Sequence, residues 1–175
     1  MSVGINFEVK RLRKIKKLFM TTIIAGLAVT VSGCALLGKA PDVSEYIDPA
    51  QESAADNEGL ISYMEELIPV LEAFYNEGKS LVEAGVKGNE INVEINLGED
   101  PSPYEDFEKL MVYETTRVTH SILNYRDYEA IKDIYKINIK FTDQKTVSLY
   151  GKQAVEAEES LDFDAVTILN AVKRN

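Results

Sequence analysis

Strict alternation of apolar and polar residues in two segments, 90–97 and 135–150, is the feature that most constrains this fold. A period of two places alternate side chains on opposite faces of a β-strand, so one face of each strand is expected to be buried. Residues 142–145 interrupt the second segment with a tight connection, which predicts a β-hairpin. The apolar residues expected on the buried face are Ile91, Val93, Ile95, Leu97, Tyr135, Ile137, Ile139, Phe141, Val147 and Leu149.

Helical periodicity precedes and separates these strands. Residues 59–84 carry apolar residues at intervals of three and four, and Pro69 within them predicts a kink or a break into two helices. Residues 102–105 (Ser-Pro-Tyr-Glu) match a capping box with proline at the first helical position. A second helix is therefore expected from residue 102 to about Arg126.

The C-terminal part predicts a closing helix over 162–173, whereas 153–159 is consistent with either a further strand or a loop. The resulting order of elements is α, β, α, β, β, an optional β and α. We therefore expect an α+β fold with a three- to four-stranded, mainly antiparallel sheet and helices packed on one face.

The chain begins with a basic segment followed by an apolar one. The basic residues are Lys10, Arg11, Arg13, Lys14, Lys16 and Lys17. The apolar segment from Leu18 to Val31 is short for a transmembrane helix, which needs roughly 20 residues. Small residues then lead to Cys34, the only cysteine, in the sequence Val31-Ser32-Gly33-Cys34.

This N-terminal pattern resembles the signal peptide and lipobox of bacterial lipoproteins. The resemblance implies that Cys34 is the lipid attachment site, linked by a thioether to diacylglycerol, and that it becomes the mature N-terminus. It also implies a protein anchored to the cell membrane on its extracytoplasmic face. A signal peptide followed by an ordinary free cysteine and an N-terminal signal anchor are the alternatives.

Three regions follow from this pattern. Residues 1–33 are expected to be the signal peptide. Residues 34–57, which contain two prolines and several acidic residues, are expected to be the lipidated cysteine and a flexible acidic tether. The apolar pair Tyr46 and Ile47 leaves open a short contact of this tether with the domain. Residues 58–175 have a length suited to a single domain that needs neither a disulfide nor a metal for its core.

Charge divides sharply between these regions. The chain has 19 Lys and Arg against 29 Asp and Glu, and its first 33 residues hold six of the basic and one of the acidic residues. The remainder therefore carries 13 basic and 28 acidic residues, a net charge of about −15. Such a surface repels nucleic acids and anionic lipid headgroups, so nucleic acid is excluded as a partner.

The sequence predicts no catalytic residue, metal ligand set or cofactor site. His120 is the only histidine, and no residue at helical spacing from it would orient or activate it, so it is expected to be a partly exposed helix residue. No nucleophile motif, phosphate-binding loop or spaced set of oxygen ligands for calcium occurs.

The polar face of the expected sheet is the candidate site. One hypothesis is that its residues form a docking face for a protein or envelope partner, because Asn and Tyr on flat strands make adaptable contacts. They are Asn92, Glu94, Lys136, Asn138, Lys140 and Tyr150. A solvated face with cross-strand ion pairs is the plainer interpretation. The sequence thus favours a non-enzymatic binding module, with an envelope-associated hydrolase, an enzyme subunit or a small-ligand binder as alternatives.

Overall fold

Residues 42–76, 78–126, 129–157 and 160–174 are described by the computed structural model. The expected signal peptide, residues 1–33, and Cys34 lie outside these residues. The elements are η1 (Ser44–Tyr46), α2 (Pro49–Glu52), α3 (Glu58–Glu72), β1 (Ser80–Lys87), β2 (Glu90–Asn96), α4 (Phe107–Asn124), η2 (Glu129–Asp133), β3 (Lys136–Phe141), β4 (Thr146–Tyr150), η3 (Gly151–Gln153), β5 (Val155–Ala157), β6 (Ser160–Asp162) and α5 (Ala165–Lys173).

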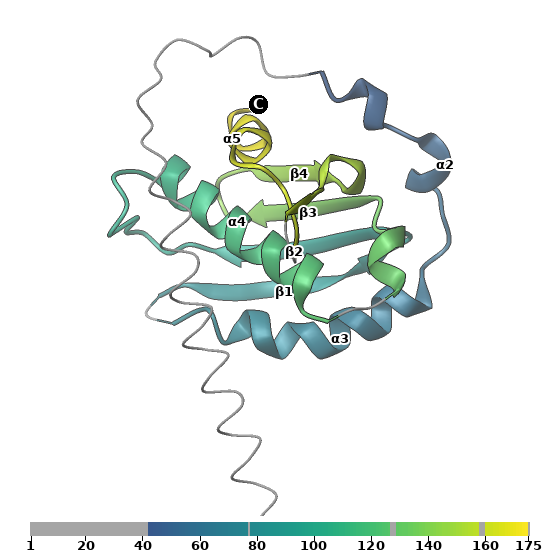
Figure 1. The fold of residues 1–175 in the computed structure, drawn as a ribbon. Coiled ribbons are helices and arrows are strands. Elements are labelled where there is room, and N and C mark those ends of the chain that lie inside the picture. Colours follow the sequence, from purple (N-terminus) through teal and green to yellow (C-terminus); the bar gives the residue numbers. More distant parts are fainter. Residues whose placement is uncertain (1–41, 77, 127–128, 158–159, 175) are drawn as a thin grey trace, which may run out of the picture. The chain divides into compact units, whose positions relative to one another are not determined.

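The main sheet has the strand order β1-β2-β3-β4, and α3, α4 and α5 lie on one side of it (Figure 1). The pairs β1–β2 and β3–β4 are antiparallel, whereas β2–β3 is parallel. A parallel pair requires a long crossover connection, and α4 lies within the connection between β2 and β3. The expected α+β class, with a mainly antiparallel sheet and helices on one face, is confirmed.

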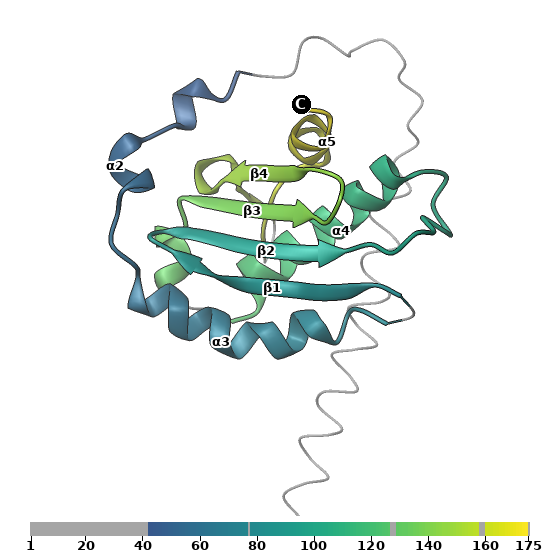
Figure 2. The ribbon, with the colours of Figure 1, turned by 180° about the vertical axis from the view of Figure 1, so that it is seen from behind.

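Alternation in the strands produces the core. The apolar positions of β2, β3 and β4 point toward the helices and are buried; Ile91, Ile95, Ile137, Ile139 and Leu149 have no exposed surface. Leu60, Leu67 and Leu71 of α3 and Leu110, Val118 and Ile122 of α4 complete this layer. Seen from behind, the opposite face of the four strands carries no helix (Figure 2).

The expected helical pattern over 59–84 is wrong in its second half. Helix α3 contains Pro69 but ends at Glu72, and residues 80–87 form β1, the strand paired with β2 at the edge of the sheet. Strand alternation is hidden in β1 because its register shifts between Leu81 and Glu83, which leaves Val82 54% exposed. Pairing with β2 therefore decides the structure of a segment with an ambiguous period.

The second helix begins later than its apparent capping box predicts. Helix α4 starts at Phe107, and the N-cap is Asp106, whose carboxylate accepts a hydrogen bond of 2.8 Å from the Lys109 amide. The Ser102 amide instead donates to the Asp100 side chain at 2.8 Å, which makes 100–102 a turn. In the C-terminal part, β5 pairs with β6, so the open question about 153–159 is resolved in favour of a strand at 155–157.

Residues 44–57, which we call the strap, pack against one end of the main sheet, although their composition predicts a flexible tether. The Asn57 amide donates to the Gly88 carbonyl at 3.1 Å, and the Gly88 amide donates to the Asp56 carboxylate at 2.7 Å. Gly88 has φ +60°, and a Cβ there would lie 2.9 Å from the carbonyl oxygen of Ala54. The packed unit therefore includes residues before position 58.

Candidate docking face

Strand register arranges the polar face of the sheet in three rows that each cross β2, β3 and β4. The central row is Asn92, Asn138 and Ser148; the second is Glu94, Lys140 and Thr146; the third is Glu90, Lys136 and Tyr150. Each row contains at least one of the residues that the sequence predicts for the docking face. The structure thus brings all six predicted residues onto the same side of the sheet.

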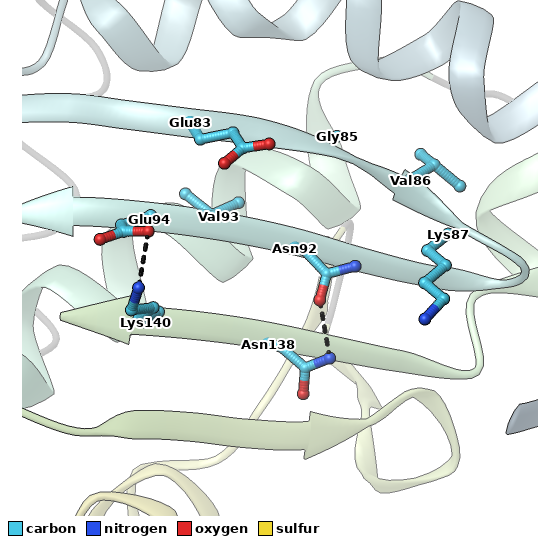
Figure 3. Close-up of a pocket in the computed structure, with 9 residues that line it drawn as sticks. All are labelled: Glu83, Gly85, Val86, Lys87, Asn92, Val93, Glu94, Asn138 and Lys140. Carbon is cyan, nitrogen blue, oxygen red and sulfur yellow. Dashed lines mark hydrogen bonds and ion pairs between the residues drawn. The ribbon is translucent and has the colours of Figure 1, made fainter. Parts of the chain in front are cut away.

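Hydrogen bonds join the central row across three strands. The Ser148 hydroxyl donates to Asn138 Oδ1 at 2.7 Å, and Asn138 Nδ2 donates to Asn92 Oδ1 at 3.0 Å and to a Glu90 carboxylate oxygen at 2.8 Å. Figure 3 shows the two asparagines pointing toward each other across β2 and β3. These side chains are held in defined orientations, so the row offers a preorganised amide surface.

An ion pair dominates the second row. Lys140 Nζ lies 3.0 Å from one carboxylate oxygen of Glu94, and the Thr142 hydroxyl donates to the other at 3.1 Å. The hydrogen bond from Lys140 holds the pKa of Glu94 below its usual value. Lys140 is exposed, so this pair stays accessible to a partner.

A hollow of about 320 Å³ lies over β1, β2 and β3 on this side (Figure 3). Its lining consists of Glu83, Gly85, Val86, Lys87, Asn92, Val93, Glu94, Asn138 and Lys140. Gly85 lies opposite Asn92, and no heavy atom would lie within 4 Å of a Cβ at that position. Six of these nine residues have polar or charged side chains, although the surface that lines the hollow is more apolar than polar. We call the rows of Asn92 and Glu94, with Glu83 and Lys87, the open face.

The third row is covered. Lys136 has a side chain only 15% exposed, with Nζ 2.8 Å from a Glu90 oxygen. Tyr150 is 8% exposed, because the Tyr46 ring of the strap stacks on it with centroids 6.0 Å apart. Four of the six predicted residues therefore lie on the open face, and two lie under the strap. No local sequence signal connects Tyr46 with Tyr150, so the sequence alone could not reveal this cover.

His120 has a partner that the sequence analysis missed. Its Nδ1 lies 2.7 Å from a carboxylate oxygen of Asp162, and the Ser160 hydroxyl donates to the other oxygen at 2.6 Å. Asn124 exchanges two hydrogen bonds with the backbone of Leu161, which fixes β6 against α4. Asp162 is distant in sequence and belongs to a different element, so helical spacing around His120 gave no indication of this contact.

The described part of the chain contains no metal-binding cluster and no membrane-spanning helix. Among its residues, no group of three or more His, Cys, Asp or Glu side chains could hold a metal ion. No helix of that part is long and apolar enough to cross a membrane. The chain matches no protein-family model, no curated protein and no solved structure.

Proposed function

We propose that this protein is a lipid-anchored bacterial protein on the extracytoplasmic face of the cell membrane. Its folded unit is a non-enzymatic module that docks another protein or an envelope component. The observation that carries the docking role is the open face, a preorganised polar surface across four strands with no helix over it. The anchor rests on the N-terminal pattern that ends in Cys34.

Charge supports the choice of this surface. The open face carries two carboxylates and two ammonium groups: Glu83, Glu94, Lys87 and Lys140. These charges cancel, although the chain after residue 33 has a net charge of about −15. Juxtaposed like charges cost several kcal/mol at an interface, so a charge-balanced surface on an acidic molecule favours association.

Fatty-acid labelling tests the anchor. Cells that express the full chain are grown with radiolabelled palmitate, and the label is expected on the unchanged protein but not on Cys34→Ser. Ser32→Ala keeps a small residue before the cysteine and serves as the matched control that retains the label. Label that persists in Cys34→Ser would overturn the assignment of the anchor.

Site-specific photo-crosslinking tests the docking surface. A photoreactive amino acid at Asn92 on the open face is expected to give a discrete crosslinked species in cells. The same group at Glu65, an exposed position on α3, is the control and should give none. Lys140→Glu, which reverses a charge beside Asn92, should remove the species while the thermal unfolding curve stays in place. A crosslinked species that remains in Lys140→Glu would argue against docking of the partner on the open face.

An envelope-associated hydrolase or enzyme subunit is the second candidate, and the contact between His120 and Asp162 is the observation that favours it. A carboxylate bound to one imidazole nitrogen can orient a histidine for acid–base chemistry. The Ser160 hydroxyl, however, donates to Asp162 and not to His120, so this arrangement does not activate it as a nucleophile. His120→Gln that abolishes the cellular role but keeps the Asn92 crosslink would favour the enzyme.

A further inference from the structure

The strap covers an aromatic and cationic site at one end of the main sheet. Tyr135 and Tyr150 lie edge to face with their ring centroids 5.6 Å apart, and both are 8% exposed. The strap contributes the stacked ring of Tyr46, and the amide of its Asp48 donates to the Tyr135 hydroxyl at 2.8 Å. The strap therefore contacts both Tyr135 and Tyr150, through one ring and one backbone amide.

Lys136 lies at the centre of this contact. Its Nζ is 5.7 Å from the Tyr135 ring centroid and 5.9 Å from that of Tyr150, within the range of cation–π attraction. Two carboxylates flank it: Glu90 of β2 at 2.8 Å and Glu52 of the strap at 3.9 Å. The sheet and the residue before β3 thus provide two rings, an ammonium group and the carboxylate of Glu90, and the strap provides one ring and one carboxylate.

The strap itself is held weakly. None of the residues in the two short helices η1 and α2 is buried, and Ile47, its one large aliphatic side chain, is 46% exposed. Its remaining contacts are mostly part-buried hydrogen bonds, including one of 2.8 Å from Asn89 Nδ2 to Gln51 Oε1. Segments with few buried apolar contacts open at low free-energy cost, so the strap can leave while the strands beneath it keep their core.

We infer that Tyr135, Lys136 and Tyr150 form a binding site for an acidic, tyrosine-bearing peptide segment of a partner protein, which the strap fills in the free molecule. The strap shows what the site selects: an aromatic ring for Tyr150 and, six residues later, a carboxylate near Lys136. Release of the strap adds the third row to the open face. The role of this added row rests on the proposed docking function, whereas the peptide site does not.

Peptide binding to the full chain in detergent tests the inference. The probe is a fluorescent synthetic peptide of residues 42–57. The double variant Tyr46→Ala/Glu52→Gln weakens the strap and should bind the probe about tenfold more tightly than the unchanged chain, because a competing strap reduces the open fraction of the site. Ile47→Ala, which alters an exposed strap residue, is the control and should bind like the unchanged chain.

A further variant keeps the test specific. Lys136→Gln added to the weakened strap should abolish binding of the probe, with circular dichroism confirming that the chain is folded. A folded weakened-strap variant that does not bind the probe would overturn the site. Strap exchange between two copies, detected as a dimer by light scattering, would overturn the assignment to a partner protein. The Asn92 crosslink is independent of the probe, so failure of the docking function would be seen separately.

Discussion

Both faces of the main sheet are formed by the same strands, because alternate residues point to opposite sides, but the two faces have different roles. On the covered face, Ile137 and Ile139 are completely buried against helices. On the open face, the side chain of the intervening Asn138 takes part in three hydrogen bonds with side chains of β2 and β4. Burial of apolar area is the main stabilising term in folding, so the covered face stabilises the fold and the open face can vary with function.

This contrast predicts a graded response to substitution. The largest effect is expected for Ile139→Ala, which should lower the free energy of unfolding by about 2–5 kcal/mol by removing buried methyl groups and leaving a cavity. Chemical denaturation measures it. Val166→Ala is the matched control, since Val166 is 66% exposed, and it should stay within about 0.5 kcal/mol of the unchanged protein. Equal effects at both positions would contradict the assignment of the covered face.

Tyr150→Ala tests where the boundary between the faces lies. Tyr150 is on the polar side of β4, but its ring is buried between Tyr46 and Tyr135. The expected cost is about 2–4 kcal/mol, because large aromatic side chains lose extensive packing when truncated. Denaturation of this variant beside Tyr46→Ala separates the contribution of the strap. A cost like that of an exposed residue would show that the strap does not bury this ring.

Asn138→Ala removes the centre of the hydrogen-bonded row. We expect a loss of about 1 kcal/mol in the free energy of unfolding, the net scale of side-chain hydrogen bonds whose partners can turn to water. Asn138→Asp keeps the shape of the side chain and the acceptor for Ser148 but loses the donor to Asn92 and Glu90. Its free energy of unfolding should therefore be equal to or lower than that of the alanine variant. A loss as large as that of Ile139→Ala would mean that both faces stabilise the fold equally.

Lys140→Gln should have the smallest effect on stability, and its clearest result should be a change in the pKa of Glu94. The pKa of Glu94 is lowered in the folded protein by Lys140, so this carboxyl contributes stability above its unfolded pKa and loses it as the pH falls through the folded pKa. In Lys140→Gln the pKa of Glu94 should rise toward its usual value, and that acid-dependent loss should shrink. Side-chain carbon NMR during a pH titration measures the change; an unmoved pKa would contradict the pairing.

Alternation was sufficient to predict β2, β3 and β4, because a strand buried on one face strongly restricts which residues point inward. It was insufficient for β1, where the register shift at Val82 breaks the period and pairing with β2 decides the structure. The helix at Ala165–Lys173 was also predicted, and its N-cap is Asp164. All six predicted residues of the docking face could be placed on one side of the sheet from their positions in the strands alone.

What the sequence could not provide were contacts between distant segments with no periodic signal. The stacking of Tyr46 on Tyr150 and the hydrogen bond between His120 and Asp162 each join segments far apart in the chain. Composition was also misleading for the strap, because its proline and its acidic residues are typical of linkers. Its few specific contacts, such as that of Asp56 with Gly88, depend on a turn conformation that composition does not encode.

The strap also sets a length scale. Under the proposed attachment at Cys34, the chain from Cys34 to Tyr46 can span at most about 40 Å, since each residue spans at most 3.3–3.6 Å. If the strap is released from the sheet, the chain from Cys34 to Glu58 can span at most about 80 Å. Binding and release of the strap would then set two different limits on the distance between the membrane anchor and the open face. The released strap would let the open face contact a partner deeper in the cell envelope.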